Sequence, residues 1–370
     1  MIHLFESRVT AEAIAEVMAT LQSRRLNQGA KVKEFESQLE SGWGLTNPLT
    51  VNSCTSALML ALRLANVGPG DEVILPAQTF IATGVVVKLA GATPVWADIQ
   101  PHTGNIDPSD IDRKITPRTK AVIVVDWGGL PCDLSMIKAL LRPHGIPLIE
   151  DAAQAFGASY EHHPIGSVAD HTCFSLQAIK CLTTGDGGVL CCRNVDDYKR
   201  ARRLRWFGID REELKVNEVG ERVFTLSEAG YKFHMNDLIA SLGIGNLRNL
   251  ESAIMFAGIV ARTYTVGLEN LKRVKLLKPP TDRVGSHWFF SLLVDDPAKF
   301  IKFMKAGNVE SSVVDLRIDR HPVFDGGANL PATEEFNQHH VALPTHSYMS
   351  LDDVGYIIKL VKEYDNLVDT

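Results

Sequence analysis

The sequence predicts an α/β fold, in which a large domain with a mostly parallel sheet flanked by helices precedes a smaller C-terminal α+β domain. Between residues 50 and 195, short β-branched runs alternate with longer stretches of helical periodicity, as is typical of a parallel sheet covered on both faces. After residue 195 charged helical segments dominate, and beyond residue 250 short strands and helices mix. The 370 residues correspond to about two and a half average domains. We therefore expect a large domain over 1–249 and a small domain over 250–370.

The expected strands are short apolar or β-branched runs bounded by turn residues. They cover 72–75, 93–97, 121–125, 146–149, 172–176 and 188–192. The expected helices place apolar residues three and four positions apart. They cover 56–66, 79–89, 134–142 and 237–250, with a charged helical segment at 198–213.

Charge and composition exclude several classes of protein. The net charge of −6 and the absence of a basic run argue against nucleic-acid binding. No stretch approaches the roughly 18 apolar residues that a membrane helix requires, and the N-terminal segment lacks the features of a secretory signal. The six cysteines form no CxxC pair, so the spacing of a zinc site or a thioredoxin-type motif is missing. We expect a soluble cytoplasmic protein.

A first candidate ligand site is the segment 52–56, with the sequence Asn-Ser-Cys-Thr-Ser, at the start of an apolar helix. The free N–H groups of a helix N-terminus, together with flanking hydroxyls, bind phosphate well. Taken alone, the segment is more typical of an ordinary N-cap.

A second candidate is Asp151, directly after the strand expected at 146–149. A carboxylate at the inner end of a buried strand needs a positive partner or a metal. Gln154, three residues on, is placed to project to the same side. Glu150 leaves a metal site open, although no histidine cluster accompanies the pair. A structural ion pair of Asp151 is the other alternative.

A third candidate is Lys180, within the segment FSLQAIKCLTTGDGG. It is the only formally charged residue between Asp170 and Asp186, and its neighbours are apolar. A desolvated lysine has a lowered pKa, which makes its amine a nucleophile for a carbonyl. The three glycines that follow predict a tight turn whose backbone approaches a ligand. An ordinary surface lysine is the alternative.

The three candidates explain one another if the ligand is pyridoxal phosphate. This cofactor needs a lysine for its Schiff base, a carboxylate for its pyridine nitrogen and a helix N-terminus with hydroxyls for its phosphate. The GxGxxG and GxxxxGK motifs are absent, which disfavours NAD and ATP. The GxSxG motif of serine hydrolases is absent as well.

Here the sequence resembles the DegT/DnrJ/EryC1/StrS family of nucleotide-sugar aminotransferases, which have the type I fold of aspartate aminotransferase. The motifs that carry the resemblance are NSCTSAL, GDEVILPAQTFIAT, IEDAAQAFGA, FSLQAIKCLTTGDGG and GYKFHMNDLIASLG. Segments HPVF and ALPTH extend it nearly to the C-terminus. The most specific part is the lysine followed by TTG and an acidic-Gly-Gly run.

The resemblance implies a role for each matching residue. Lys180 becomes the Schiff-base lysine and the acid/base of the proton shift, and Asp151 pairs with the pyridine nitrogen. The residues implied to bind the cofactor are Cys54, Thr55, Ser56, Phe80, Asp151, Gln154, Ser175, Lys180 and Lys232. Lys232 is implied to reach the phosphate of a second subunit, which makes the protein a homodimer with shared active sites.

The chain departs from the family pattern at several positions. The family often has Asn at Lys232, Gly at Cys54, Glu at Asp186 and His at Phe207. The role of Lys232 and the substrate contacts near Phe207 are therefore less defined by the resemblance than the roles of Lys180 and Asp151.

The resemblance implies transfer of an amino group from L-glutamate to a keto group, at C4, of a nucleotide-linked deoxysugar. The alternatives are a C3-specific aminotransferase, a sugar dehydratase and a non-catalytic cofactor-binding regulator. Lys180 disfavours the dehydratase, because dehydratase relatives carry histidine there. We expect no regulator, because the two expected domains account for the 370 residues and leave none for a DNA-binding module.

Several histidines remain. His287 and His321 fall in segments that the family uses near the nucleotide sugar. The adjacent pairs at 162–163 and 339–340 are expected to be solvated loop residues rather than metal ligands.

Overall fold

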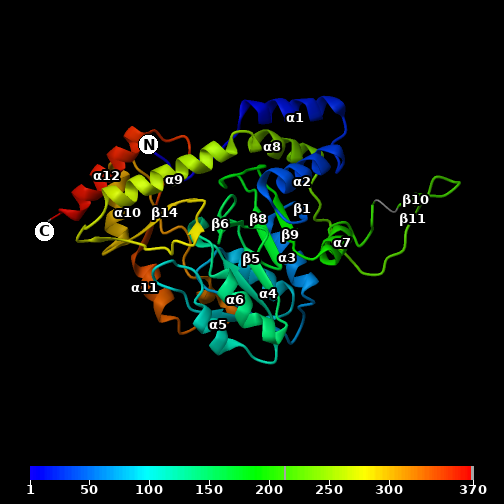
Figure 1. Ribbon diagram of the computed structural model, residues 1–370, viewed down its shortest axis with the longest axis horizontal. Helices are drawn as coiled ribbons and strands as arrows, with labels where there is room; N and C mark the ends of the chain where they lie inside the picture. Colours follow the sequence, from blue (N-terminus) through cyan, green and yellow to red (C-terminus); the bar gives the residue numbers. More distant parts are fainter. Residues whose placement is uncertain (212–213, 368–370) are drawn as a thin grey trace.

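The centre of the computed structural model, which describes residues 1–211 and 214–367, is a seven-stranded sheet in the order β1-β9-β8-β5-β4-β2-β3 (Figure 1). Neighbours from β8 to β3 pair in parallel, and β9 runs antiparallel to both of its neighbours. The strands are β1 (Pro48–Val51), β2 (Glu72–Pro76), β3 (Thr93–Ala97), β4 (Thr119–Val125), β5 (Leu148–Asp151), β8 (His171–Ser175) and β9 (Gly188–Cys192). The predicted mostly parallel sheet is confirmed.

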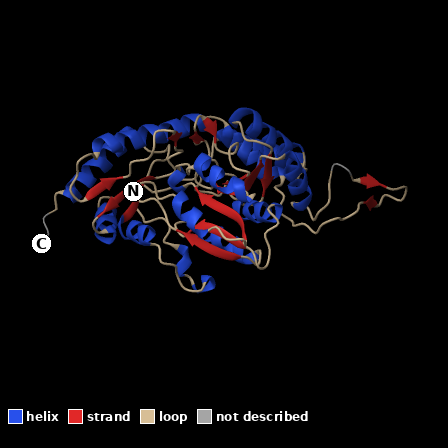
Figure 2. Cartoon of the chain, turned by 60° about the horizontal axis from the view of Figure 1, so that its bottom comes forward, coloured by secondary structure: helices blue, strands red, loops and turns tan. Residues whose placement is uncertain are grey.

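Helices cover both faces of this sheet, with the strands enclosed between them (Figure 2). One face packs on α2 (Ala30–Trp43), α5 (Pro108–Lys114), α6 (Leu134–Leu141) and α8 (Asp237–Leu247). The other packs on α3 (Cys54–Leu64), α4 (Ile81–Leu89) and α7 (Val195–Leu204). Along β4, Val122 and Val124 point to the first layer and Ala121 and Ile123 to the second. Burial on both faces explains why this strand is apolar at every one of these positions.

Two predicted segments are corrected by the structure. The helix expected over 198–213 ends at Leu204, and a hairpin of β10 (Lys215–Val216) and β11 (Arg222–Val223) follows; residues 212–213 lie outside the described part. The strand expected at 146–149, ending in Glu150 and Asp151, begins two residues later as β5 and includes both acidic residues. Propensity alone suggested a helix after 204 because the segment is charged, but no apolar stripe there offers a core-facing side.

The C-terminal part has its own core around a three-stranded antiparallel sheet of β12 (Val274–Leu276), β14 (Phe290–Val294) and β15 (His340–Leu343). Its helices are α9 (Leu250–Gly267), α10 (Pro297–Ala306), α11 (Pro331–His339) and α12 (Leu351–Asp365). This separate core supports the proposed division at residue 250. Contacts nevertheless cross that division: Ile2 pairs with Val309, for example, and Ile318 packs into the core around α3.

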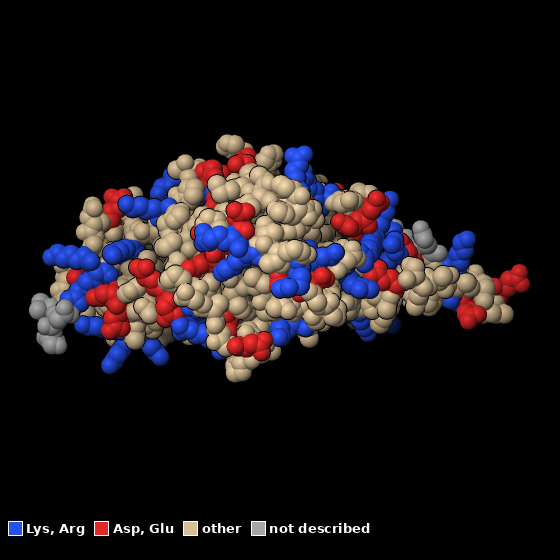
Figure 3. Space-filling model, turned by 90° about the horizontal axis from the view of Figure 1, so that it is seen from below, with Lys and Arg blue, Asp and Glu red and all other residues tan. Residues whose placement is uncertain are grey.

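The remaining elements join these parts. Helix α1 (Ala11–Ser23) packs on α8, and a small sheet joins β13 (Arg283–Val284), β6 (Ser159–Tyr160) and β7 (His163–Pro164). Short 3-10 turns lie at Trp127–Gly129, Arg142–His144, Ile318–Arg320 and Pro322–Phe324. Among the described residues no helix combines the length and the apolar character needed to cross a bilayer. Positive and negative side chains are interspersed over the face seen in Figure 3.

Candidate active site

The carboxyl ends of β5 and β8 and the N-terminus of α3 meet around a cavity of about 430 Å3. Parallel strands place their carboxyl ends at one edge of a sheet, where open α/β sheets bind ligands. Seven of the residues expected at the site line this cavity. They are Cys54, Thr55, Phe80, Asp151, Gln154, Ser175 and Lys180.

The first turn of α3 is built by hydroxyl groups. Ser53 is the N-cap, and its Oγ accepts a hydrogen bond of 3.1 Å from the amide of Ser56. The Ser56 hydroxyl donates to Oδ1 of Asn52 at 2.6 Å. Ser56 is therefore buried and does not line the cavity. Its side chain fixes the turn that the resemblance implies to hold the phosphate.

Two amides at this turn remain free for an anion. Within the described residues no hydrogen bond engages the backbone N–H groups of Cys54 and Thr55, which lie at the positive end of the helix dipole. Gly188 at the start of β9 packs directly beneath, since a Cβ there would lie 2.6 Å from the Cys54 nitrogen. Only glycine permits this close approach of strand and helix.

Asp151 lies at the bottom of the cavity and is 5% exposed. Its Oδ2 accepts a hydrogen bond of 2.8 Å from Thr83, and its Oδ1 accepts one of 3.2 Å from the Ala153 amide. Burial raises the pKa of Asp151, while the Thr83 hydrogen bond opposes that rise. A cation at this carboxylate removes the cost of burying its charge. Sequence reasoning missed Thr83, although Thr79 and Thr83 stand one helical turn apart and their hydroxyls are 2.8 Å apart.

Glu150 points to the opposite face of β5 from Asp151. It is fully buried, and Thr172 donates a hydrogen bond of 2.8 Å to it. Burial, and then the charge of the adjacent Asp126, raise the pKa of Glu150. Consecutive residues of a strand face opposite sides, so the two acidic neighbours do not share one site. The described part of the chain contains no group of three or more His, Cys, Asp or Glu placed to hold a metal ion.

Lys180 lies in the loop between β8 and β9, and its Nζ is 3.4 Å from the centre of the Trp288 ring. Burial lowers the pKa of Lys180 to about 8, and the negative charge of Asp151 opposes this shift. About a tenth of such amines are neutral at pH 7, far more than for a solvated lysine. The Trp288 indole donates to the Ile179 carbonyl at 2.9 Å, and Phe5 stacks on Trp288 at 4.5 Å. Sequence reasoning missed Phe5 and Trp288, because both lie far from Lys180 in the sequence.

The other cavity residues surround this pair. Gln154 lines the cavity and accepts a hydrogen bond of 2.7 Å from the Gly128 amide through its Oε1. Ser175 ends β8 and accepts from the Gln177 amide at 3.3 Å. Phe80 is the N-terminal flanking residue of α4 and is 57% exposed at the cavity.

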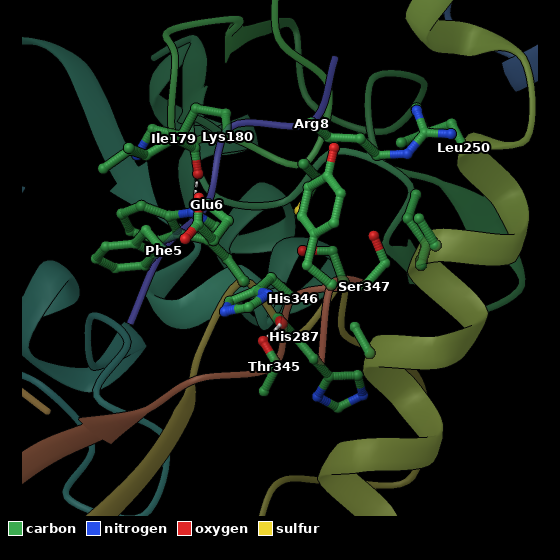
Figure 4. Close-up of a pocket in the computed structure, with 17 residues that line it drawn as sticks. Phe5, Glu6, Arg8, Ile179, Lys180, Leu250, His287, Thr345, His346 and Ser347 are labelled. Atoms are coloured by element: carbon green, nitrogen blue, oxygen red, sulfur yellow. Dashed lines mark hydrogen bonds between the residues drawn. The ribbon is translucent and has the colours of Figure 1, made fainter. Parts of the chain in front are cut away.

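Three expected site residues, His287, His321 and Lys232, do not line this cavity. His287 lines a second cavity of about 50 Å3, which also includes Lys180, Arg8 and His346 (Figure 4). Burial lowers the pKa of His287. The side chains of His321 and Lys232 are exposed and line neither cavity.

The two pairs of adjacent histidines differ in their exposure to solvent. His162 and His163 are exposed, as expected. His340 contradicts the expectation of a solvated loop, because it lies in β15 and is 1% exposed. Its Nε2 is 3.0 Å from the Ser291 hydroxyl, and burial lowers its pKa to about 3.

These residues fit pyridoxal phosphate. The free amides of Cys54 and Thr55 suit a phosphate, buried Asp151 suits a protonated ring nitrogen, and the Lys180 amine suits an aldehyde. Bound, the cofactor supplies an electron-withdrawing ring and an aldehyde that carries the amino group.

Comparisons with known proteins agree with this assignment. The model of the DegT/DnrJ/EryC1/StrS aminotransferase family matches residues 7–362. The spore coat polysaccharide biosynthesis protein SpsC of Bacillus subtilis is 35% identical, over 95% of this chain and 94% of its own. The dTDP-4-dehydro-2,3,6-trideoxy-D-glucose 4-aminotransferase of Saccharopolyspora spinosa is 31% identical, over 92% and 90%.

Solved structures agree as well. The sugar aminotransferase CalS13 of Micromonospora echinospora superposes with a TM-score of 0.93 at 31% identity, covering 98% of this chain and all of that one. The PLP-form of a sugar aminotransferase from Streptococcus pneumoniae superposes with a TM-score of 0.91 at 28% identity, covering 99% of both chains. The chain therefore belongs to the DegT/DnrJ/EryC1/StrS aminotransferase family and is a pyridoxal-phosphate-dependent sugar aminotransferase.

Proposed function

We propose that this enzyme moves the amino group of L-glutamate to the C4 keto group of a nucleotide-linked deoxysugar. The observation that carries the proposal is the placement of Lys180, with its pKa of about 8, in one cavity with Asp151 and the N-terminus of α3. The Saccharopolyspora spinosa relative is named as a 4-aminotransferase of a dTDP-linked keto-deoxysugar, which supports both the substrate class and the C4 position.

Each residue of the cavity has its own part in the proposed reaction. Lys180 would hold the cofactor at rest, and its amine, when free, would move the proton to and from the substrate carbon that carries the amino group. Asp151 would keep the ring nitrogen protonated, Gln154 would hold the ring hydroxyl, and Phe80 would pack against the ring. The amides of Cys54 and Thr55, with the Ser175 hydroxyl, would hold the phosphate.

Absorbance spectra test the two half-reactions of the proposed function separately. Glutamate added to the purified holoenzyme should convert the pyridoxal form to the pyridoxamine form, and a keto sugar should reverse the change. A panel of nucleotide sugars with the keto group at C3 or at C4 then identifies the acceptor. No spectral change with glutamate would contradict the proposed donor. Reversal by C3-keto sugars alone would contradict the C4 position.

We also propose a homodimer in which each active site uses both subunits. Lys232 supports this, because its backbone borders the start of α3 while its side chain is exposed and enters neither cavity near Lys180. The hairpin of β10 and β11 projects from the body, and its apolar residues are exposed (Figure 1). Val216, Val219 and Val223 are 65%, 85% and 52% exposed. Such an apolar arm suits a second copy of the chain.

Dilution tests the dimer. Because the partner's lysine completes the phosphate site, dissociation should release cofactor. We expect the sedimentation coefficient and the absorbance of bound cofactor to fall together as the protein is diluted from micromolar to nanomolar concentration. A monomer that keeps its full cofactor content and activity would show that the site is complete within one chain.

A further inference from the structure

Asp315 is a carboxylate of the active-site cavity that the roles above do not use. It comes from the C-terminal part of the chain and lines the same cavity as Lys180 and Asp151. The structure records no hydrogen bond or ion pair of its side chain within the described residues, although its backbone carbonyl accepts from Gln78 at 3.2 Å. Partial burial of the carboxyl raises its pKa, and the positive charge of Lys180 opposes this. A half-buried carboxylate facing a cavity without a partner is costly unless a ligand supplies a donor.

The other carboxylates of the cavity wall are already engaged. Asp151 accepts from Thr83, and Asp186 accepts from the Gly187 amide at 2.9 Å. Glu310 accepts from the Leu4 amide at 3.1 Å and holds the N-terminal segment in place. Asp315 differs from all of these in having its oxygens directed to no donor among the described residues.

The backbone around Asp315 is held in an unfavourable conformation. Val314 has φ +63°, a left-handed conformation that a β-branched residue rarely adopts. Its amide donates to the Ser312 hydroxyl at 3.1 Å, and the Ser312 carbonyl accepts from Ala342 in β15 at 2.8 Å. On the other side, Arg317 is fixed by the Asn337 side chain, which accepts from its amide at 2.7 Å. Strain maintained by contacts on both sides is a mark of a functional position.

The charge of Asp315 selects among the molecules that enter the cavity. The cofactor phosphate and the two carboxylates of glutamate are anions, which a carboxylate repels, and the amino group of glutamate is engaged at the cofactor aldehyde in the proposed function. The cofactor ring nitrogen faces Asp151 in the proposed function. The sugar ring of the acceptor is the remaining candidate partner for Asp315. Its hydroxyl or amide N–H groups donate hydrogen bonds that a carboxylate accepts well.

We propose that Asp315 determines acceptor specificity by accepting a hydrogen bond from a hydroxyl or N–H group of the sugar ring next to the keto carbon. This inference rests on the proposed function and deepens it: it makes the natural acceptor a sugar that keeps a donor beside the reacting carbon. A fully deoxygenated ring leaves the carboxylate unpaired, and a site built for a hydrogen bond discriminates strongly against a substrate that lacks it.

The test compares two acceptors in three enzymes. The probes are 4-keto-6-deoxyhexoses on the nucleotide that the panel above selects, one with hydroxyls at C2 and C3 and one without them. The wild type should prefer the hydroxylated sugar at least tenfold in kcat/KM. Asp315→Leu should reduce that preference to within about twofold, and Asp315→Asn, which keeps an acceptor oxygen, should fall between them. Glu310→Gln removes a charge from the same wall and should keep the wild-type preference.

The glutamate half-reaction separates the possible outcomes. In Asp315→Leu, the rate of pyridoxamine formation from glutamate should stay within about threefold of wild type, because glutamate does not use Asp315. A slower half-reaction with a displaced pH profile would show that Asp315 acts through the Lys180 amine, and would overturn the inference. An unchanged preference in Asp315→Leu would overturn it too. If the wild type responds to glutamate but aminates neither probe nor any other keto sugar, the proposed acceptor itself is wrong.

Affinity gives a readout that does not depend on turnover. In the pyridoxal form of the holoenzyme, which carries no amino group to give to a keto sugar, calorimetry should show the hydroxylated probe binding at least tenfold more weakly when Asp315 is replaced by Leu. Equal affinity in the presence and absence of Asp315 would contradict the proposed contact.

Discussion

Lys180→Ala should lose the absorbance of bound pyridoxal phosphate and at least about 10⁴-fold of its transamination rate. In the proposed function the amine is both the attachment point of the cofactor and the acid/base of the proton shift, and positioned acid–base catalysis alone contributes up to about 10⁴-fold. No other lysine lines the cavity of the described structure, so alanine leaves no amine to take its place. Spectra and single-turnover rates with glutamate measure both effects.

Lys88→Ala is the matched control for this variant. Lys88 lies in the last turn of α4 and forms a surface ion pair of 3.6 Å with Asp325. Exposed ion pairs contribute little to stability, so this variant should keep its spectrum and rate. Retained pyridoxal absorbance or turnover in Lys180→Ala would show that another residue carries the chemistry.

Asp151→Asn should bind the cofactor but transfer the proton more slowly by two orders of magnitude or more. The carboxylate is desolvated at the bottom of the cavity, where an opposite charge interacts far more strongly than in water. An asparagine amide is neutral and does not hold a proton on the ring nitrogen. Stopped-flow measurement of pyridoxamine formation reports the step, and cofactor absorbance confirms that the site is loaded.

Glu150→Gln is a sharp control, because it makes the same change of carboxyl to amide one residue away. Burial already favours the protonated, neutral form of Glu150, and its side chain lies on the other face of β5. Glutamine matches that neutral form in shape, so turnover should stay within threefold of wild type. If Asp151→Asn also stayed within about threefold, a barrier change under about 1 kcal/mol, the role of Asp151 would be wrong.

Glu150 and Asp151 at the end of β5 show what the local sequence pattern could not predict. The apolar run at 146–149 predicted a strand that ends in Glu150 and Asp151, but not how hydrogen bonds with β4 and β8 orient that end. This pairing fixes Glu150 and Asp151 on opposite faces of the sheet, so that only Asp151 lines the cavity. The pairing of neighbouring strands is absent from the local pattern.

The segment after Leu204 shows the same limit. Its charge pattern predicted a longer helix, whereas β10 and β11 form a hairpin that projects from the body. A helix without an apolar face gains little from packing, so charge and helix propensity alone do not maintain a helix there.

The sequence by itself determined the α/β class, the strand–helix order between 50 and 195, and the three candidate cofactor positions at 52–56, Asp151 and Lys180. These follow from local periodicity and from motifs within single loops, which need no partner distant in the chain. Tertiary structure alone placed Trp288 against Lys180, Thr83 against Asp151, and Asp315 in the cavity wall. Each of these contacts joins residues more than 60 positions apart, and such contacts are set by the packing of whole elements rather than by any neighbouring residue.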